Sequence, residues 1–229
     1  MNHSNDDLLN LNKRAYDKIA PAFSASRSYV WPDLWPFMEY IKDGDRVLDL
    51  GCGNGRLLML LAEKSVEYLG VDFSEKLIEQ ARVNRPDKEF AVMDALDLKL
   101  PDDAFDVVIC VSVLNHIPLD KQNLFVANVK RVLKPGGVLL MANWNLWNIF
   151  NKKSVWFNGL KKDVMTTWKG GGENEPLYYY AFTRRALKKL LERGCLVVEQ
   201  SFYSRKGKRT HGLFGHNIIT IVKKSNINI

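Results

Sequence analysis

The sequence predicts a single-domain α/β fold: a mostly parallel seven-stranded sheet with helices on both faces and a helical segment at the N-terminus. Three observations predict it. Strand-like apolar runs alternate with helical patterns from residue 46 onward. A glycine-rich turn follows the first of these runs. The 229 residues, 46% of them hydrophobic, suffice for one core but not for two ordinary domains. Such alternation is typical of a parallel sheet whose ligands bind at the carboxyl ends of the strands.

Residues 1–45 are predicted to form an N-terminal helical cap. Apolar side chains recur at helical spacing over residues 5–20, and Pro21 is expected to end that helix. A second short helix is expected over residues 32–41. The turn Asp43-Gly44-Asp45 should end it.

Residues 46–143 are predicted to be the cofactor-binding core. Strands are expected at 46–50, 67–71, 89–92, 106–111 and 138–142. Helical segments are expected at 57–63, 74–84 and about 119–133, and a turn at 134–137. Ser74 is a suitable N-cap for the second of these helices.

Residues 144–180 interrupt this rhythm and are predicted to be an inserted substrate loop. The segment is rich in Trp, Tyr and Lys and contains Gly170-Gly171-Gly172. A loop of this length is usually a lid, a binding surface or a disordered insert. Residues 181–229 should complete the sheet, with a helix at about 183–192 and strands near 196–203 and 217–223.

The charge distribution indicates an anionic partner. The chain carries 33 basic and 26 acidic side chains, but residues 144–229 alone carry 16 basic and five acidic ones. Such a gradient is typical of a basic rim around a binding site. No apolar run could span a membrane, the start MNHSNDDLLN is unlike a signal peptide, and the three cysteines lack metal-ligand spacing. We therefore expect a cytoplasmic protein without a metal site or a membrane or DNA partner.

The glycine turn favours a positively charged ligand. It reads Asp49-Leu50-Gly51-Cys52-Gly53-Asn54-Gly55, whereas a dinucleotide-binding G-x-G-x-x-G would place a glycine where Arg56 stands. Glycines let the backbone approach a ligand closely. A carboxylate two residues before the first glycine suits an ammonium or sulfonium group better than a pyrophosphate.

Further along, Asp72 ends the second strand, where a carboxylate can accept both hydroxyls of a ribose. Phe73 could pack on an adenine, and Asp94 could accept from its amino group. The alternative is that the glycines only form a tight turn and Asp72 only caps a helix.

Five segments in order now resemble one family, the Rossmann-like class I S-adenosylmethionine-dependent methyltransferases. They are VLDLGCGNGR, the acid at 72, MDA at 93–95, FDVVI at 105–109 and RVLKPGGVLL at 131–140. The resemblance implies S-adenosyl-L-methionine as cofactor. Its expected contacts are Tyr16, Arg27, Asp49, Gly51, Cys52, Gly53, Gly55, Asp72, Phe73, Asp94, Ala95 and Val111.

Two further segments resemble the tRNA wobble-uridine methyltransferases that esterify 5-carboxymethyluridine. One runs from Tyr16 to Ser24 and continues to Arg27 and Trp31-Pro32; the other is Tyr178-Tyr179-Tyr180. The resemblance implies a tRNA anticodon loop as substrate and a small zinc-binding activator protein as partner. It departs from the family at Asn115-His116, where a His-His pair is common.

The implied chemistry needs a cation rather than a base, because a carboxylate is already ionised at neutral pH. Arg27 is the predicted catalytic cation; it could hold the substrate acid or the methionine carboxylate of the cofactor, or be a surface arginine. His116 is predicted to be catalytic by hydrogen bonding to substrate, unless it caps the following helix.

The predicted substrate-binding residues combine aromatic rings with positive charges, as recognition of splayed RNA bases requires. They are Trp31, Asn115, Trp144, Trp168, Tyr178, Arg205, Lys206, Lys208 and Arg209. The insert and the RKGKR segment at 205–209 should flank one active-site mouth. The alternative is a solvated basic face with a few buried aromatics.

Two other functions compete with tRNA methylation. A small-molecule methyltransferase, acting on a quinone precursor or another anionic metabolite, would have a closed apolar pocket and no need for the basic tail. A non-catalytic RNA-binding protein would keep the fold but lose cofactor affinity, although the intact glycine loop and Asp72 speak against it.

Overall fold

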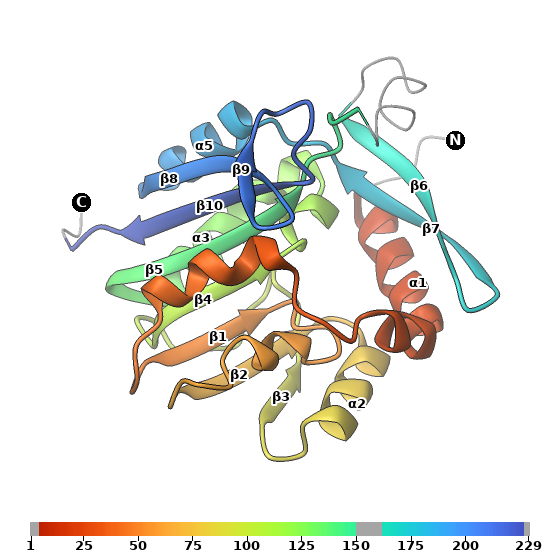
Figure 1. The fold of residues 1–229 in the computed structure, drawn as a ribbon, viewed down its shortest axis with the longest axis horizontal. Coiled ribbons are helices and arrows are strands. Elements are labelled where there is room, and N and C mark those ends of the chain that lie inside the picture. The colour runs from red at the N-terminus through yellow and green to blue at the C-terminus, as the bar shows by residue number, and fades with distance from the viewer. Residues whose placement is uncertain (1–4, 150–161, 227–229) are drawn as a thin grey trace.

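The computed structural model describes residues 5–149 and 162–226 and centres on an eight-stranded sheet. The parallel strands are β1 (Arg46–Leu50), β2 (Glu67–Asp72), β3 (Glu89–Val92), β4 (Phe105–Val111) and β5 (Leu133–Trp144). The antiparallel strands are β10 (Asn217–Lys224), β8 (Leu196–Arg205) and β9 (Lys208–Thr210). The order across the sheet is β3-β2-β1-β4-β5-β10-β8-β9 (Figure 1).

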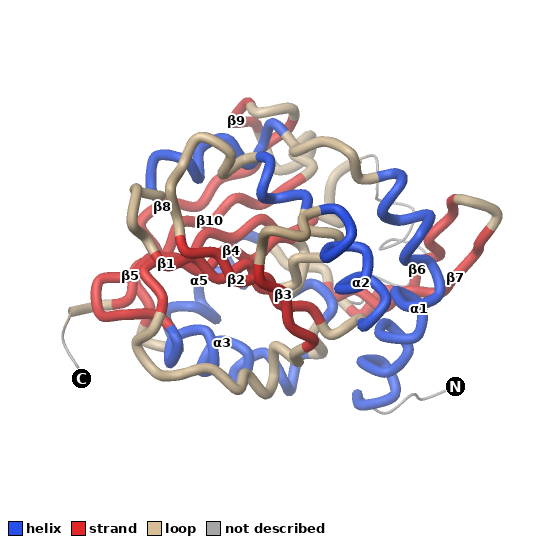
Figure 2. The backbone as a smooth tube through the Cα atoms, turned by 90° about the horizontal axis from the view of Figure 1, so that it is seen from below, coloured by secondary structure: helices blue, strands red, loops and turns tan. Residues whose placement is uncertain are grey.

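Helical segments cover both faces of the sheet (Figure 2). Each face has its own apolar core. Helices α3 (Gln122–Val132) and α5 (Arg184–Arg193) pack on one face through residues such as Phe125 and Leu187. The other face is covered by α2 (Glu75–Asn84) and the 3₁₀ segments η1 (Pro32–Tyr40) and η2 (Arg56–Met59). Strands buried on both sides explain the continuous apolar runs of β1 and β4.

A third layer lies beyond the carboxyl ends of the parallel strands (Figure 1). It consists of helix α1 (Asn5–Ser26) and a separate hairpin of β6 (Asp163–Gly170) and β7 (Glu173–Tyr180). Two short 3₁₀ turns, η3 (Leu114–His116) and η4 (Leu119–Lys121), follow β4. An apolar cluster that includes Ala15 of α1 and Tyr179 of β7 joins the helix to the hairpin.

A buried amide fixes α1 against the hairpin. The side chain of Asn12 is 1% exposed; its Oδ1 accepts from the Tyr178 backbone N–H at 2.8 Å, and its Nδ2 donates to the Tyr178 carbonyl at 3.0 Å. The amide therefore bonds to the outer edge of β7 as a neighbouring strand would.

The predicted fold class is confirmed, with five differences in detail. Helix α1 continues through Pro21 to Ser26, because tertiary contacts hold its last turn: the Asn54 Nδ2 reaches the Ser24 carbonyl at 3.3 Å. In place of the helix expected at 57–63, the chain forms the 3₁₀ segment η2 followed by turns. The residue before η2, Gly55, has a left-handed conformation and no side chain that could cap a helix. The turn expected at 134–137 is an irregularity inside β5, where the register to β4 shifts.

The other two differences concern strands that the sequence did not predict. The sheet has an eighth strand, β9, whose three residues are too few and too polar to form a pattern. The insert predicted as a loop contains β6 and β7, with Gly171 and Gly172 at positive φ in their turn. None of the helices in the described ranges is long and apolar enough to cross a bilayer.

We predict that Asn12→Ala lowers the free energy of unfolding by about 1–3 kcal/mol, because the buried Tyr178 N–H loses its partner and the Tyr178 carbonyl keeps only the His116 ring. Urea denaturation monitored by circular dichroism measures this. Asn10→Ala, an exposed amide on the same helix, is the matched control. Equal stability of the two variants would contradict the role given to Asn12.

Candidate functional site

A cavity opens at the carboxyl ends of the parallel strands, between the glycine turn, α1 and the β6–β7 hairpin. The loops after β1, β2, β3 and β4 and the last residue of β5 contribute to its wall. Most of the predicted site residues line it: Tyr16, Arg27, Trp31, Asp49, Gly51, Cys52, Gly53, Asp72, Phe73, Asp94, Ala95, Val111, His116, Trp144 and Trp168. The topology thus brings together residues that are up to 152 positions apart in the sequence.

The glycine turn brings bare backbone to the cavity. Its first glycine, Gly51, has φ +75° and donates its N–H to the Val71 carbonyl at 2.7 Å. A Cβ at Gly51 would lie 2.1 Å from the Cγ2 of Val113, so a side chain has no room there. Gly55 differs from the prediction: it does not line the cavity, and a Cβ there would face the ring of Phe90.

Two backbone N–H groups fix the side chain of Asp72, the acid at the end of β2. Its Oδ2 accepts from the Gly53 N–H at 2.9 Å and its Oδ1 accepts from the Ser74 N–H at 3.0 Å. Burial raises the pKa of Asp72 to about 6. Phe73 and Asp94 line the wall beside it. The carboxylate keeps further lone pairs for two hydroxyl groups.

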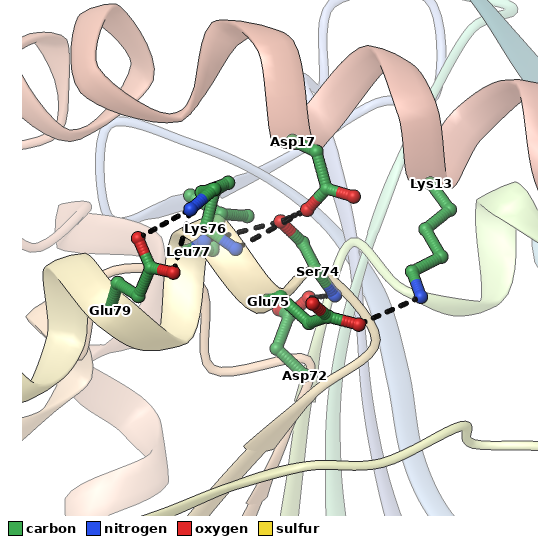
Figure 3. Close-up of polar contacts among 8 residues, drawn as sticks. All are labelled: Lys13, Asp17, Asp72, Ser74, Glu75, Lys76, Leu77 and Glu79. Atoms are coloured by element: carbon green, nitrogen blue, oxygen red, sulfur yellow. Dashed lines mark hydrogen bonds and ion pairs between the residues drawn. The ribbon is translucent and has the colours of Figure 1, made fainter.

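Helix α1 is tied to the same place by the side chain of Asp17 (Figure 3). Its Oδ1 accepts from the Ser74 Oγ at 2.7 Å and from the Lys76 N–H at 3.3 Å, at the N-terminus of α2. An exposed ion pair between Lys13 and Glu75, 3.5 Å long, lies nearby. These contacts hold the neighbouring Tyr16 over the cavity.

His116 lines the cavity, but both of its ring nitrogens contact protein groups. Its Nδ1 is 2.9 Å from the Tyr178 carbonyl and 3.1 Å from the Asn12 Nδ2. The carbonyl can only accept, so we assign the proton to Nδ1, and the Asn12 Nδ2 then donates to the Tyr178 carbonyl and not to the ring. The ring Nε2 then accepts from the Tyr16 hydroxyl at 3.0 Å. Burial lowers the pKa of His116 to about 4, so the ring is neutral. His116 therefore orients Tyr16 and does not cap a helix.

Aromatic rings form the opposite wall. Trp144 stacks on Tyr179, with ring centroids 5.7 Å apart and planes 17° from parallel, and Trp168 completes this side. The sequence prediction chose the wrong tyrosine. Successive side chains of a strand point to opposite sides, so Tyr178 lies in the main core, where its hydroxyl donates to Asp163 at 2.6 Å, and Tyr179 lines the cavity.

Asn115 does not line the cavity either. It is fully buried; its Nδ2 donates to the carbonyl of Tyr180 at 3.0 Å, and its Oδ1 accepts from the Trp144 N–H at 2.9 Å. Its amide therefore joins β5 to β7 and positions the aromatic wall.

Two arginines supply positive charge to the cavity. The Arg27 guanidinium lies 5.1 Å from the ring centroid of Phe23, and its charge acts on Tyr16 and Tyr179. Arg56, which the prediction did not include, directly follows the glycine turn and also lines the cavity. Its place in the VLDLGCGNGR motif was the available signal.

The acid before the glycine turn is also buried. Asp49 accepts from the Tyr68 hydroxyl at 2.8 Å, and burial raises the pKa of Asp49 to about 7. Asp49 and Asp72 are therefore two carboxyl groups whose ionisation is opposed by burial.

The RKGKR segment forms the end of β8, a turn and β9, and its side chains do not line the cavity. The turn is anchored by the buried Asp33, whose Oδ1 accepts from the Gly207 N–H at 2.6 Å. The basic hairpin therefore lies beside the start of η1, two residues from the cavity residue Trp31. Residues 150–161 of the predicted insert, with Lys152, Lys153 and Trp156, lie outside the described residues.

The family model described as "Methyltransferase domain" matches residues 41–193. The chain belongs to this methyltransferase family. Membership confirms the predicted methyltransferase domain and, with it, S-adenosylmethionine as the cofactor that the site has to fit.

Curated relatives of this methyltransferase include two named tRNA (carboxymethyluridine(34)-5-O)-methyltransferase. The one from Arabidopsis thaliana is 36% identical over 132 residues, 57% of this chain and 32% of the relative. The one from Saccharomyces cerevisiae is 30% identical over 156 residues, 68% of this chain and 55% of the relative. The aligned part thus spans about a third to a half of these relatives.

Among solved structures, a methyltransferase of Haloferax volcanii, described in complex with the Trm112 methyltransferase activator, shares the fold. It has a TM-score of 0.70 and 17% identity, and the match covers 95% of this chain and 99% of that one.

The cavity of this methyltransferase fits the cofactor. The Asp72 carboxylate, fixed by two backbone N–H groups, suits the ribose hydroxyls, and Phe73 and Asp94 lie where an adenine would extend. The side-chain-free surface of the glycine turn leaves room for the methionine part, and Asp49 offers a carboxylate to its positive groups.

We predict that the affinity for S-adenosylmethionine rises as the pH increases from 5 to 8. Burial raises the pKa of Asp72 to about 6 and that of Asp49 to about 7, so each is mostly protonated below that pH. A cationic ligand selects their ionised forms, so binding below those values requires loss of protons. Each proton lost changes the dissociation constant about tenfold per pH unit.

Calorimetric titration at several pH values measures this effect. Asp49→Asn removes one titrating group and should flatten the profile between pH 6 and 7 while weakening binding. A constant affinity from pH 5 to 8 in the unmodified protein would contradict the buried-carboxyl interpretation.

Proposed function

We propose that this protein is an S-adenosylmethionine-dependent methyltransferase that esterifies the carboxymethyl group of a modified wobble uridine in tRNA. The observation that carries the proposal is the composition of the cavity, in which Arg27 is combined with the rings of Trp144, Trp168 and Tyr179, while the guanidinium of Arg56 covers the ring of Trp31. An arginine matches a carboxylate and aromatic rings stack on a base, so the cavity suits a base that bears an acid. The names of the two curated relatives support it.

The chemistry requires alignment and exclusion of water more than proton transfer. When bound, S-adenosylmethionine supplies an electrophilic methyl group on a sulfonium. The acceptor carboxylate is ionised at neutral pH, and its oxygen forms the new bond to carbon. Arg27 orients this carboxylate. Tyr16 covers the cavity on the side of α1, where its hydroxyl donates to the neutral His116.

The basic hairpin supports an RNA substrate. The β8–β9 turn carries four basic residues: Arg205, Lys206, Lys208 and Arg209. Gly207 in this turn donates its backbone N–H to Asp33, two residues from Trp31. Phosphates of an anticodon loop could contact this hairpin while one base enters the cavity. A pocket for a small metabolite would not need it.

A small zinc-binding activator protein is part of the proposal. It is supported by the solved Haloferax volcanii methyltransferase, whose partner is the Trm112 activator. The assay is therefore run with and without a Trm112-type protein from the same source.

The direct test uses tRNA that carries 5-carboxymethyluridine, purified protein and S-adenosylmethionine. Mass spectrometry of the digested nucleosides should show the carboxymethyl group gaining one methyl. No such product, with or without the activator, would contradict the proposed acceptor.

We predict that replacing Arg205, Lys206, Lys208 and Arg209 by alanine weakens tRNA binding and flattens its salt dependence. If all four contact phosphates, the slope of log K against log salt concentration should fall by about 3. Cofactor affinity should not change.

The matched control replaces Lys42, Lys64, Lys88 and Lys99, four lysines in turns at other places of the molecule. It removes the same charge, so an equal loss of tRNA affinity would indicate a general charge effect and contradict a specific role of the hairpin.

A further inference from the structure

Arg56 is a half-buried cation that has spare hydrogen-bonding capacity. Its guanidinium carbon lies 4.3 Å from the ring centroid of Trp31, and its Nη1 is shielded from solvent without a hydrogen-bond partner among the described residues. Burial, followed by the repulsion of Arg27, lowers the pKa of Arg56 to about 10. The side chain nevertheless stays protonated at neutral pH.

Such an arrangement is unfavourable unless something completes it. A buried charged donor without a partner costs free energy, and stacking on Trp31 satisfies only the face of the guanidinium, not its N–H groups. Since Arg56 lines the cavity, the missing partner can be a ligand. A guanidinium edge matches a carboxylate in two-point geometry.

The surroundings of Arg56 distinguish between the two carboxylates that this reaction brings into the cavity. Arg56 directly follows the glycine turn that the cofactor must approach, and it is close enough to Asp49 for each charge to affect the other's pKa. A cation beside an anion is complementary to the carboxylate and ammonium of one amino acid. Arg27 also acts on Arg56, but unlike Arg56 it acts on Tyr16 and Tyr179, at the aromatic end of the cavity.

We propose that Arg56, stacked on Trp31, binds the methionine carboxylate of S-adenosylmethionine, with Asp49 taking the ammonium, so that Arg27 is left for the carboxylate of the acceptor. This assignment rests on the cofactor in the proposed function and is independent of whether the acceptor is tRNA.

The test compares S-adenosylmethionine with its decarboxylated form, which keeps the adenosine, the sulfonium and the amine. Calorimetry with the full chain should show that the unmodified protein binds the carboxylated ligand about tenfold to a hundredfold more tightly. In Arg56→Ala this preference should disappear, chiefly because S-adenosylmethionine binds more weakly.

Arg27→Ala is the matched control, since it removes one cavity arginine and should keep the preference. Arg56→Lys keeps the charge without the two-point geometry and should show an intermediate preference. Urea denaturation of each variant checks that the fold is intact.

Each outcome decides between the assignments. A preference that persists in Arg56→Ala overturns the proposal, and its loss in Arg27→Ala alone places the methionine carboxylate on Arg27. If the unmodified protein binds neither ligand, the cofactor site itself is wrong. Failure to methylate tRNA alongside the expected binding pattern would overturn only the proposed acceptor.

Discussion

The position of helix α1 depends on one buried amide, and the cavity depends on the position of α1. Asn12 bonds to both backbone groups of Tyr178, and Tyr16, one turn later on the same face of the helix, reaches the Nε2 of His116. Asp17, the next residue, bonds to the N-terminus of α2 beside Asp72. Three contacts within six residues thus attach the helix to the hairpin, to η3 and to the ribose end of the cavity.

The charges of the cavity are arranged for a ligand that carries charges of both signs. Asp49 and Asp72 have raised pKa values because burial opposes their ionisation, and Arg56 has a lowered one for the same reason. A neutral ligand would leave these groups poorly solvated. A ligand with a sulfonium, an ammonium and a carboxylate would compensate these groups together.

The sheet and the glycine turn could be predicted from local sequence patterns. The side of the strand on which each tyrosine lies and the end of α1 could not, because they depend on strand register and on tertiary contacts. The motif from Val47 to Arg56 combines an apolar strand with glycines that only positive φ explains, so its place in the fold followed directly. The tyrosine run gave no strand register, and the prediction chose Tyr178 in place of Tyr179. Burial alternates along residues 163–170 of β6 in the structure, but the prediction placed this segment in a loop. Proline geometry alone favoured a helix end at Pro21, but the contacts of Ser24 with Asn54 lie 30 residues away and no local pattern reveals them.

The segment that starts η1 connects the cofactor end of the cavity to the basic edge of the sheet. Trp31 supplies the ring on which the Arg56 guanidinium lies, while Asp33, two residues later, accepts from Gly207 in the basic turn and from Asn217 of β10. Pro32, the residue between Trp31 and Asp33, packs closely against Gly207: a Cβ added to Gly207 would lie 3.2 Å from the Cβ of Pro32. Because one short, proline-containing segment makes all these contacts, the hairpin cannot shift along the sheet edge without disturbing the cavity wall. The distance between the cofactor end and the basic hairpin is therefore fixed by the fold, as it must be if a single substrate is to contact both.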